Sequence, residues 1–183
     1  MRKVVYGGAC SLDGFIAGPH GEYDWLHMSS EVGKIIEEYW KTTDTLIMGR
    51  KTWEVAAAAG GGGGVEYGDI KSYVFSRTLK TIDRPGVQLV KSDAGEFVRQ
   101  LKRERGKTIT VFGGGDFARS LFEADVIDEV GFNVHPILLG AGVPAFLDAK
   151  RRINLELLEC RKMQDGCVYV TYRVKHGRRA PKH

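Results

Sequence analysis

Residues 110–122, Thr-Val-Phe-Gly-Gly-Gly-Asp-Phe-Ala-Arg-Ser-Leu-Phe, decide the fold of this chain. The apolar run 109–112 predicts a buried strand, and Phe117, Leu121 and Phe122 recur at helical spacing directly after three glycines. A glycine turn between a strand and a helix binds phosphate well, because glycine lets the backbone approach a ligand and the helix N-terminus favours an anion. The same stretch is equally compatible with a tight turn that holds no ligand.

Length and composition indicate one globular domain. The chain has 183 residues, of which 43% are hydrophobic and 27% charged, enough to build a core of its own. We expect a single domain over residues 1–174 and a basic, disordered tail over 175–183. Five of the 27 Lys and Arg residues fall in the last eleven positions. The body is therefore close to neutral despite a net charge of +4, and composition does not favour binding to nucleic acid.

Cysteine usage and hydropathy suggest the cellular setting. Cys10, Cys160 and Cys167 show no CxxC spacing, so we expect reduced thiols in a cytoplasmic protein and no metal site. No apolar run reaches the roughly 18 residues that a membrane span needs. The N-terminus enters a strand directly, so we expect no signal peptide.

Strands and helices alternate along most of the chain. The pattern predicts strands over 4–9, 45–48, 72–75, 87–90, 109–112, 128–134, 155–161 and 168–174. It predicts helices over 30–42, 94–105 and 117–124, and a further helix that follows the turn at 49–54 and ends near residue 59. Such alternation is typical of an α/β fold with a mostly parallel sheet. The turn signal Asp165-Gly166 joins the last two strands into an antiparallel hairpin, which we expect at the C-terminal edge of the sheet.

Three connecting segments also carry expectations. Ser30 is the predicted N-cap of the first helix. Residues 11–21 are predicted to be a glycine-punctuated loop beside the first strand, where ligand contacts tend to lie. Four alanines and five glycines over 56–64 end the second helix near residue 59, because consecutive glycines do not hold a helix. This run is either a tolerated surface insertion or a flap over a pocket.

A second strand-to-helix turn, Gly49-Arg50-Lys51-Thr52, carries two cations and a hydroxyl. Ligands of open α/β sheets bind at the carboxyl ends of the strands, where both this turn and the triple glycine are expected. The two turns would each take one side of a pyrophosphate. Arg77 follows the next strand, and this set of cations suits the additional 2′-phosphate of NADPH.

A Rossmann fingerprint is the competing interpretation of the triple glycine. Gly113 to Ala118 satisfies the spacing G-x-G-x-x-A after a strand. The motif lies in the second half of the chain and not at the first strand-to-helix turn, however. The next strand ends at His135-Pro136, with no acidic residue to hold a ribose. Both features disfavour a Rossmann domain.

Several motifs together carry a resemblance to a known family. They are Ser-Leu-Asp-Gly-Phe-Ile-Ala over 11–17, Asp-Trp-Leu over 24–26, Asp-Thr-Leu-Ile-Met-Gly-Arg-Lys-Thr-Trp-Glu over 44–54, Phe-Ser-Arg over 75–77, the triple glycine, and His-Pro-Ile-Leu-Leu-Gly-Ala-Gly over 135–142. From Val4 to Val174 the chain resembles the dihydrofolate reductase-like family that includes the C-terminal reductase domain of the riboflavin biosynthesis protein RibD, and its stand-alone members most of all.

The resemblance implies a dihydrofolate reductase-like three-layer fold, with flanking helices on a mostly parallel sheet. It also implies that NADPH binds across the sheet. Ala9 would then meet the nicotinamide carboxamide through its backbone, with Ile16 and Ala17 lining the nicotinamide side. Ser76 and Arg77 would hold the adenosine 2′-phosphate end. The other cofactor contacts implied are Gly49, Arg50, Lys51, Thr52, Gly113, Gly114, Gly115 and Asp116.

The sequence departs from dihydrofolate reductases at the first helix. Those enzymes keep a carboxylate there to bind the pterin, whereas Ser30 stands in the expected place and Glu31 follows it, which argues against folate. Glu31 and Asp13 are the weak catalytic candidates, and Asp13 is equally suited to hold the turn at Gly14. Trp25, Glu31 and Asn133 are the candidates for substrate contact, although Trp25 is as easily a core residue.

Three functions remain open on the sequence alone. The first is an NADPH-dependent reductase of a small heterocyclic (pyrimidine- or pterin-like) or ribityl substrate, similar to 5-amino-6-(5-phosphoribosylamino)uracil reductase or to dihydrofolate reductase. The second is a non-catalytic nucleotide-binding protein on the same fold, and the third is a nucleic-acid contact through the basic tail. The apolar segment 137–146 is a candidate contact for a homodimer, which the resemblance also favours.

Overall fold

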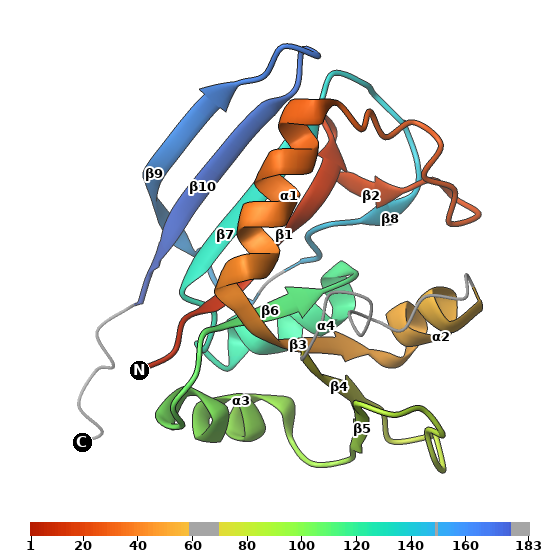
Figure 1. Cartoon of the computed structure of the whole chain (residues 1–183), viewed down its shortest axis with the longest axis vertical. Coiled ribbons are helices and arrows are strands. Elements are labelled where there is room, and N and C mark those ends of the chain that lie inside the picture. The colour runs from red at the N-terminus through yellow and green to blue at the C-terminus, as the bar shows by residue number, and fades with distance from the viewer. Residues whose placement is uncertain (59–69, 149, 177–183) are drawn as a thin grey trace.

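The computed structural model describes residues 1–58, 70–148 and 150–176. The strands are β1 (Val4–Ser11), β2 (Phe15–Ala17), β3 (Thr43–Gly49), β4 (Lys71–Phe75), β5 (Val87–Val90), β6 (Thr108–Phe112), β7 (Glu129–His135), β8 (Val143–Pro144), β9 (Asn154–Lys162) and β10 (Val168–Lys175). The helices are α1 (Ser30–Thr42), α2 (Arg50–Ala58), α3 (Ala94–Arg103) and α4 (Gly115–Glu123). Figure 1 shows their arrangement.

Eight strands form one sheet in the order β5-β4-β3-β6-β1-β7-β10-β9. The strands from β5 to β7 are parallel to their neighbours, and β10 and β9 add an antiparallel hairpin at one edge. Gly166 closes the hairpin at φ +84°, a conformation that glycine adopts without strain. The expected parallel sheet with an antiparallel C-terminal edge is therefore confirmed, and the strand order is not that of a Rossmann domain.

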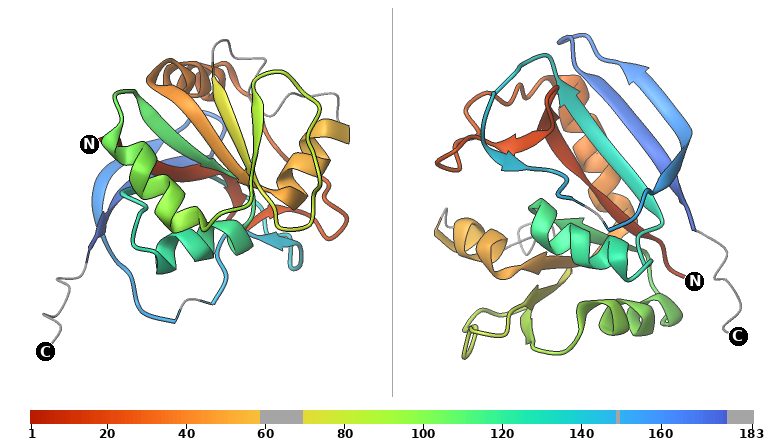
Figure 2. Two further views of the ribbon diagram at one scale, coloured as in Figure 1. Left: turned by 90° about the horizontal axis from the view of Figure 1, so that it is seen from below. Right: turned by 180° about the vertical axis from the view of Figure 1, so that it is seen from behind.

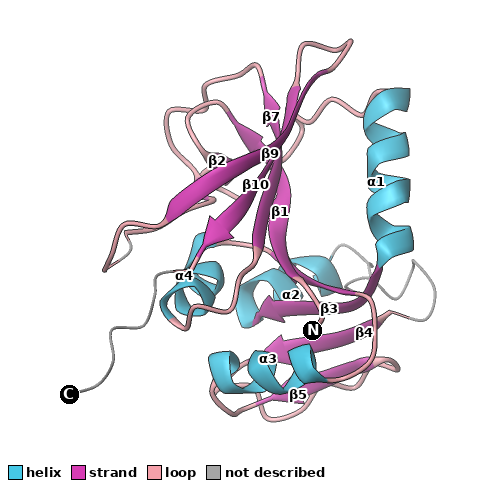
Figure 3. Cartoon of the chain, turned by 90° about the vertical axis from the view of Figure 1, so that its left-hand side faces the viewer, coloured by secondary structure: helices cyan, strands magenta, loops and turns pink. Residues whose placement is uncertain are grey.

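Helices cover both faces of the sheet and make the fold three-layered. On one face, Val98 and Leu101 of α3 and Leu121 of α4 pack with Ile47 and other strand residues. On the opposite face, Trp53 of α2 belongs to the cluster around Leu46, Met48 and Val74, and α1 packs on the β9–β10 hairpin through a third cluster. Figures 2 and 3 show the sheet between these layers.

The two long amphipathic helices begin at side-chain caps. Ser29 accepts a hydrogen bond from the backbone N–H of Val32, and Asp93 accepts one from Glu96. Both caps satisfy donors that a helix start leaves unpaired. The predicted cap at Ser30 was wrong by one residue, because Ser29 has the extended backbone that an N-cap requires and Ser30 is already helical.

Short-range pairing explains the other differences from the predicted elements. The segment 11–21 is not all loop, because Phe15 and Ala17 pair with Pro144 and Val143 in a two-stranded ribbon of β2 and β8. Neither strand has enough residues for a visible alternation. At the other end of the chain, β10 runs to Lys175, the first residue of the expected tail. Most of the Ala/Gly run and residues 177–183 lie outside the described residues.

Gly33 gives a direct test of the packing of α1. It is exposed inside the helix, and a Cβ built there would meet nothing within 4 Å. Because alanine loses less backbone entropy than glycine in a helix, we expect Gly33→Ala to raise the free energy of unfolding by about 0.5–1 kcal/mol. Chemical denaturation measures this change, and a decrease in stability would contradict the exposed position of this face.

Candidate functional site

The candidate site is built on two strand-to-helix turns at the carboxyl edge of the sheet. β3 ends at Gly49 and leads into α2, while the adjacent strand β6 ends at Phe112 and leads through Gly113 and Gly114 into α4. The turns are in direct contact, because a Cβ at Gly113 would lie 2.0 Å from Oγ1 of Thr52. Gly113 also has φ +110°, so this position requires glycine for both space and backbone conformation.

The start of α4 is open to a ligand in a way that the starts of α1 and α3 are not. Its N-cap is Gly114, and no side chain caps its first turn. The N–H groups at a helix start carry the positive end of the helix dipole and need acceptors. Ile16 of β2 and Val143 of β8 lie near Gly114, at 3.9 and 3.6 Å from the position of a Cβ there. The structure therefore brings the predicted Ile16 to the predicted glycine turn.

The third glycine has a packing role that the sequence pattern did not indicate. A Cβ at Gly115 would lie 3.0 Å from the carbonyl oxygen of Pro144 and 3.1 Å from that of Ala145. Gly115 is buried under this backbone, so it allows the segment after β8 to cross the start of α4. Its N–H group still belongs to the uncapped first turn.

Charged side chains gather around the two turns. Lys51 and Arg119 lie 3.7 and 3.6 Å from the carboxylate of Asp116, and Arg50 pairs with Glu54 at 2.9 Å along α2. All of these side chains are well exposed to solvent, so each pair contributes little to stability. The three cations outnumber the two carboxylates, and they remain free to reorient toward an anionic ligand.

Ser76 and Arg77 lie at a hollow beside the next strand ends. A cavity of about 210 Å³ is lined by residues that follow β4 and β5 and by α4, among them both predicted residues. The Ser76 hydroxyl accepts hydrogen bonds from the backbone N–H groups of Thr78 and Leu79 at 3.2 and 3.0 Å, and therefore shapes the turn. Arg77 is exposed and also lines this cavity. Lys91 and Ser92 also line it and were missed, because their strand ends in no glycine motif.

Strands β1 and β6 separate close to the glycine turn that follows β6. β6 pairs with β1 only as far as Tyr6 and Val111, whereas β7 follows β1 to Ser11. From Gly7 onwards the β6-facing edge of β1 has no strand partner among the described residues. Figure 1 shows β1 and β6 diverging there. The predicted Ala9 lies on this free edge, where its backbone groups are available to an amide.

The two catalytic candidates are engaged in structural contacts. The carboxylate of Asp13 accepts hydrogen bonds from the Ser11 hydroxyl at 2.6 Å and from the backbone N–H groups of Leu139 and Gly140 at 3.2 and 2.8 Å. The Ser11 hydroxyl and these N–H groups hold the pKa of Asp13 below its usual range. Asp13 thus joins the loop after β1 to the loop after β7, and it is ionised at neutral pH.

Glu31 likewise does not point to the glycine turns. Its carboxylate accepts a hydrogen bond from the backbone N–H of Gln164 at 2.9 Å, which ties the start of α1 to the β9–β10 hairpin. Trp25 is buried and lies edge-on to His135, with ring centroids 5.3 Å apart. Asn133 is buried on β7 opposite Ala9 of β1. Asn133 is therefore the predicted substrate residue that lies next to Ala9, on the edge of β1 that pairs with β7.

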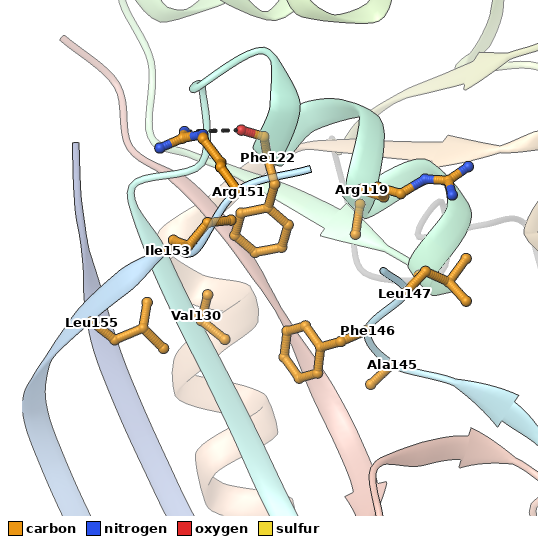
Figure 4. A pocket seen from close by; sticks show the side chains of 11 residues that line it. Arg119, Phe122, Val130, Ala145, Phe146, Leu147, Arg151, Ile153 and Leu155 are labelled. Atoms are coloured by element: carbon orange, nitrogen blue, oxygen red, sulfur yellow. Dashed lines mark hydrogen bonds between the residues drawn. The ribbon is translucent and has the colours of Figure 1, made fainter. Parts of the chain in front are cut away.

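A second cavity, of about 200 Å³, lies on the α4 side of the sheet (Figure 4). Apolar side chains from α4, β7, β9 and the segment after β8 surround it, with Arg119 and Arg151 at its rim. Arg151 donates to the carbonyl oxygen of Phe122 at 3.3 Å. Except for Gly115, its lining residues are absent from the predicted site. Those of α4 follow the glycine motif on the buried side of the helix, and the others come from segments with no recognisable motif.

Other chemistries find no support in the described ranges. These residues hold no group of three or more His, Cys, Asp and Glu side chains placed to bind a metal ion. None of their helices combines the length and the apolar character needed to cross a membrane. All three cysteines are free thiols.

Comparison with known proteins places the chain in a family. The RibD C-terminal domain family matches residues 2–169. The chain is 32% identical over 181 residues to the uncharacterized protein YyaP of Bacillus subtilis, covering 94% of this chain and 95% of YyaP. The chain belongs to the RibD C-terminal domain family, as the sequence resemblance predicted.

Solved structures agree with this assignment. A Shewanella sp. PV-4 protein named for riboflavin biosynthesis superposes with a TM-score of 0.78 at 26% identity, covering 96% of this chain and all of that one. Dihydrofolate reductase from Enterococcus faecalis, in complex with NADP(H), superposes with a TM-score of 0.69 at 18% identity, covering 95% and 97% of the two chains. The dihydrofolate reductase-like fold is thereby confirmed.

Neighbouring glycines provide a matched test of the turn. Gly113→Ala would place a methyl group against Thr52 at a positive φ, and we expect it to lower the free energy of unfolding by about 1–3 kcal/mol. Gly114→Ala is the control, since its φ is −80° and its nearest contacts are side chains at 3.6 Å or more. Denaturant titrations measure both. Equal losses for the two variants would contradict the contact between the turns.

Proposed function

We propose that this protein is an NADPH-dependent reductase that transfers hydride to a small heterocyclic, pyrimidine- or pterin-like, or ribityl substrate. The observation that carries the proposal is the uncapped start of α4. It lies beside the turn of α2, and it follows β6 at the end where the edge of β1 becomes free. Membership of the RibD C-terminal domain family and the NADP(H) complex of the Enterococcus reductase support it.

The residues present fit this cofactor. In the proposed complex the N–H groups of Gly114, Gly115 and Asp116 donate to the pyrophosphate, which is also where Lys51 and Thr52 lie. Arg77 pairs with the 2′-phosphate, for which a guanidinium supplies a planar fork of donors. The free backbone of Ala9 holds the carboxamide, and Ile16 and Ala17 shield the ring. NADPH then supplies the hydride, and the protein supplies position and a dry surface.

The proton that accompanies hydride transfer does not come from Asp13 or Glu31 in this proposal. Asp13 stays ionised because three donors surround it, and the Glu31 carboxylate holds the hairpin. Water or the substrate itself supplies the proton. In this proposal, reduction of the substrate needs no strong acid from the protein. Ser30 stands where dihydrofolate reductases keep the carboxylate that binds the pterin, which disfavours folate.

The 2′-phosphate contact gives the first prediction for binding. Loss of a charge-assisted hydrogen bond costs about 1.5–3 kcal/mol, so Arg77→Ala should weaken NADPH binding about 10- to 100-fold and leave NADH binding unchanged. Fluorescence titration of both nucleotides measures the two affinities. The control is Lys41→Ala, which removes an exposed cation of α1 that pairs with Glu37 one turn earlier in the same helix.

The outcomes separate the reductase from its alternative. Oxidation of NADPH with a pyrimidine or pterin supports the reductase, whereas tight binding with no turnover on any such compound favours a non-catalytic nucleotide-binding protein. Absence of binding for both nucleotides would falsify the two together. We propose a cytoplasmic location and no nucleic-acid partner, and an unchanged affinity for DNA on removal of residues 175–183 tests the latter.

We also propose that the protein forms a homodimer through the outer hairpin. Leu155, Leu157 and Leu158 of the edge strand β9 are 40–55% exposed, and Phe146 at the adjacent cavity is 50% exposed. Apolar groups on a sheet edge favour association with another chain. Leu157→Glu should shift sedimentation to the monomer, whereas Leu138→Glu, in the segment 137–146 first considered, should not. The opposite pattern would assign the contact to that segment.

A further inference from the structure

Asn133 has an amide atom that the protein leaves without a partner. The residue is 8% exposed, and its Oδ1 is buried with no hydrogen bond among the described residues. Its Nδ2 lies 3.3 Å from Nε2 of His135, two residues further along β7. A buried polar atom without a partner is destabilising, so such an atom calls for an explanation.

The surroundings of His135 determine which of its nitrogens carries the proton. The backbone N–H of His27 points at Nδ1 from 3.4 Å, and Sγ of Cys167 lies 3.4 Å from the same atom. A backbone N–H can only donate, so Nδ1 is an acceptor. Burial, followed by the neighbouring Asp165 carboxylate, raises the pKa of the Cys167 thiol to about 11, so the thiol keeps its proton.

The His135 ring is also neutral. His135 is 1% exposed and stacks on His27, and burial followed by the charge of His27 lowers its pKa, against an opposing effect of Asp165. A neutral imidazole whose Nδ1 accepts carries its proton on Nε2. Nε2–H therefore donates toward the amide of Asn133.

This tautomer fixes the orientation of the amide. An amide group can be turned by 180° with almost no change of shape, and hydrogen bonding decides which end faces a neighbour. Two donors would face one another if Nδ2 stayed beside Nε2–H. Oδ1 therefore accepts from His135, and the NH₂ group takes the buried position that has no partner.

That position lies on the face of the sheet where substrate is expected. Val130 and Phe132 face the α3–α4 core, so alternation along β7 places Gly131, Asn133 and His135 on the α1 face. In register, Ala9 of β1 flanks Asn133 on one side and Tyr169 of β10 on the other. A glycine and an alanine add little side-chain volume here, and Ala9 is the residue proposed to meet the nicotinamide.

We propose that Asn133 determines substrate specificity by donating from its NH₂ group to an acceptor on the substrate, a ring carbonyl oxygen or an unprotonated ring nitrogen. His135 is the positioning residue that turns the amide, and the backbone N–H of His27 holds the His135 tautomer. The proposal rests on the reductase function, which it deepens by naming the substrate class. A heterocycle that presents an amino group at this point faces a donor and is rejected.

The experiment compares two probes that differ in one group. Binding of 5,6-diaminouracil and of its counterpart with a 4-amino group in place of the 4-oxo group is measured by calorimetry with NADPH present. The wild type should prefer the oxo compound at least tenfold, since one hydrogen bond and one avoided donor–donor contact favour it. Asn133→Asp, which keeps the shape but offers an acceptor, should reverse the preference. Asn154→Asp on β9 makes the same chemical change at an exposed position and should leave it unchanged.

Two further measurements separate positioning from folding. His135→Phe keeps a ring but removes the Nε2–H donor, so the ratio of the two affinities should fall toward one while NADPH affinity is retained. Nitrogen NMR of the histidine ring in the unliganded wild type should show the proton on Nε2. A proton on Nδ1, or an oxo/amino preference that Asn133→Asp does not change, would overturn the proposal.

The proposed function fails by a different result. If NADPH does not bind, the reductase assignment falls, whatever the NMR spectrum shows. If NADPH binds and is oxidised with other compounds but neither probe binds, the reductase remains and the acceptor assignment at Asn133 is wrong.

Discussion

The close approach of Gly113 to Thr52 is the constraint on which the site depends. β3 and β6 are adjacent parallel strands, and each leads into a helix at the same edge of the sheet. Only a residue without a side chain, able to adopt φ +110°, lets the two turns touch. Contact at this point places the uncapped start of α4 beside Lys51 and Thr52. β6 pairs with β1 only as far as Val111, so the proposed anion site and the free edge of β1 lie at the same end of β6.

The other edge of β1 keeps its strand partner where β6 no longer follows. β1 stays paired with β7 as far as Ser11, so Ala9 and Asn133 are held side by side although β6 has left. Ser11 and Asp13 then anchor the following loop to the segment after β7. Asp13, the catalytic candidate beside β1, therefore serves to fix loops, which agrees with a reaction whose chemistry is carried by a cofactor.

The main elements could be predicted from the sequence because their signals are local. Apolar runs and helical spacing identified the eight strands of the main sheet and the four helices, and the two glycine turns located the edge at which they meet. β2 and β8 were missed because two- and three-residue strands depend on pairing between segments about 130 residues apart. The cap was misplaced by one residue because Ser29 and Ser30 are chemically identical, and only the backbone distinguishes them.

The site was predictable to a smaller extent. Motifs pointed to the residues at the strand ends, but not to the packing role of Gly115 or to the engagement of Asp13 and Glu31 with distant backbone. Asp13 and Glu31 contact backbone groups 126 and 133 residues away, and Gly115 packs against Pro144 of another segment. No spacing along the chain records these contacts. The proposed tautomer of His135 depends in the same way on the backbone N–H of His27, which is 108 residues away.

The most direct test of the account is amide NMR of the labelled protein during titration with NADPH. If the glycine turn and the free edge of β1 hold the cofactor, the N–H signals of Ala9, Gly114, Gly115 and Asp116 shift together and saturate at one affinity, while those of the β9–β10 hairpin stay in place. Saturable binding that leaves these four signals unmoved and shifts others would contradict the proposed site.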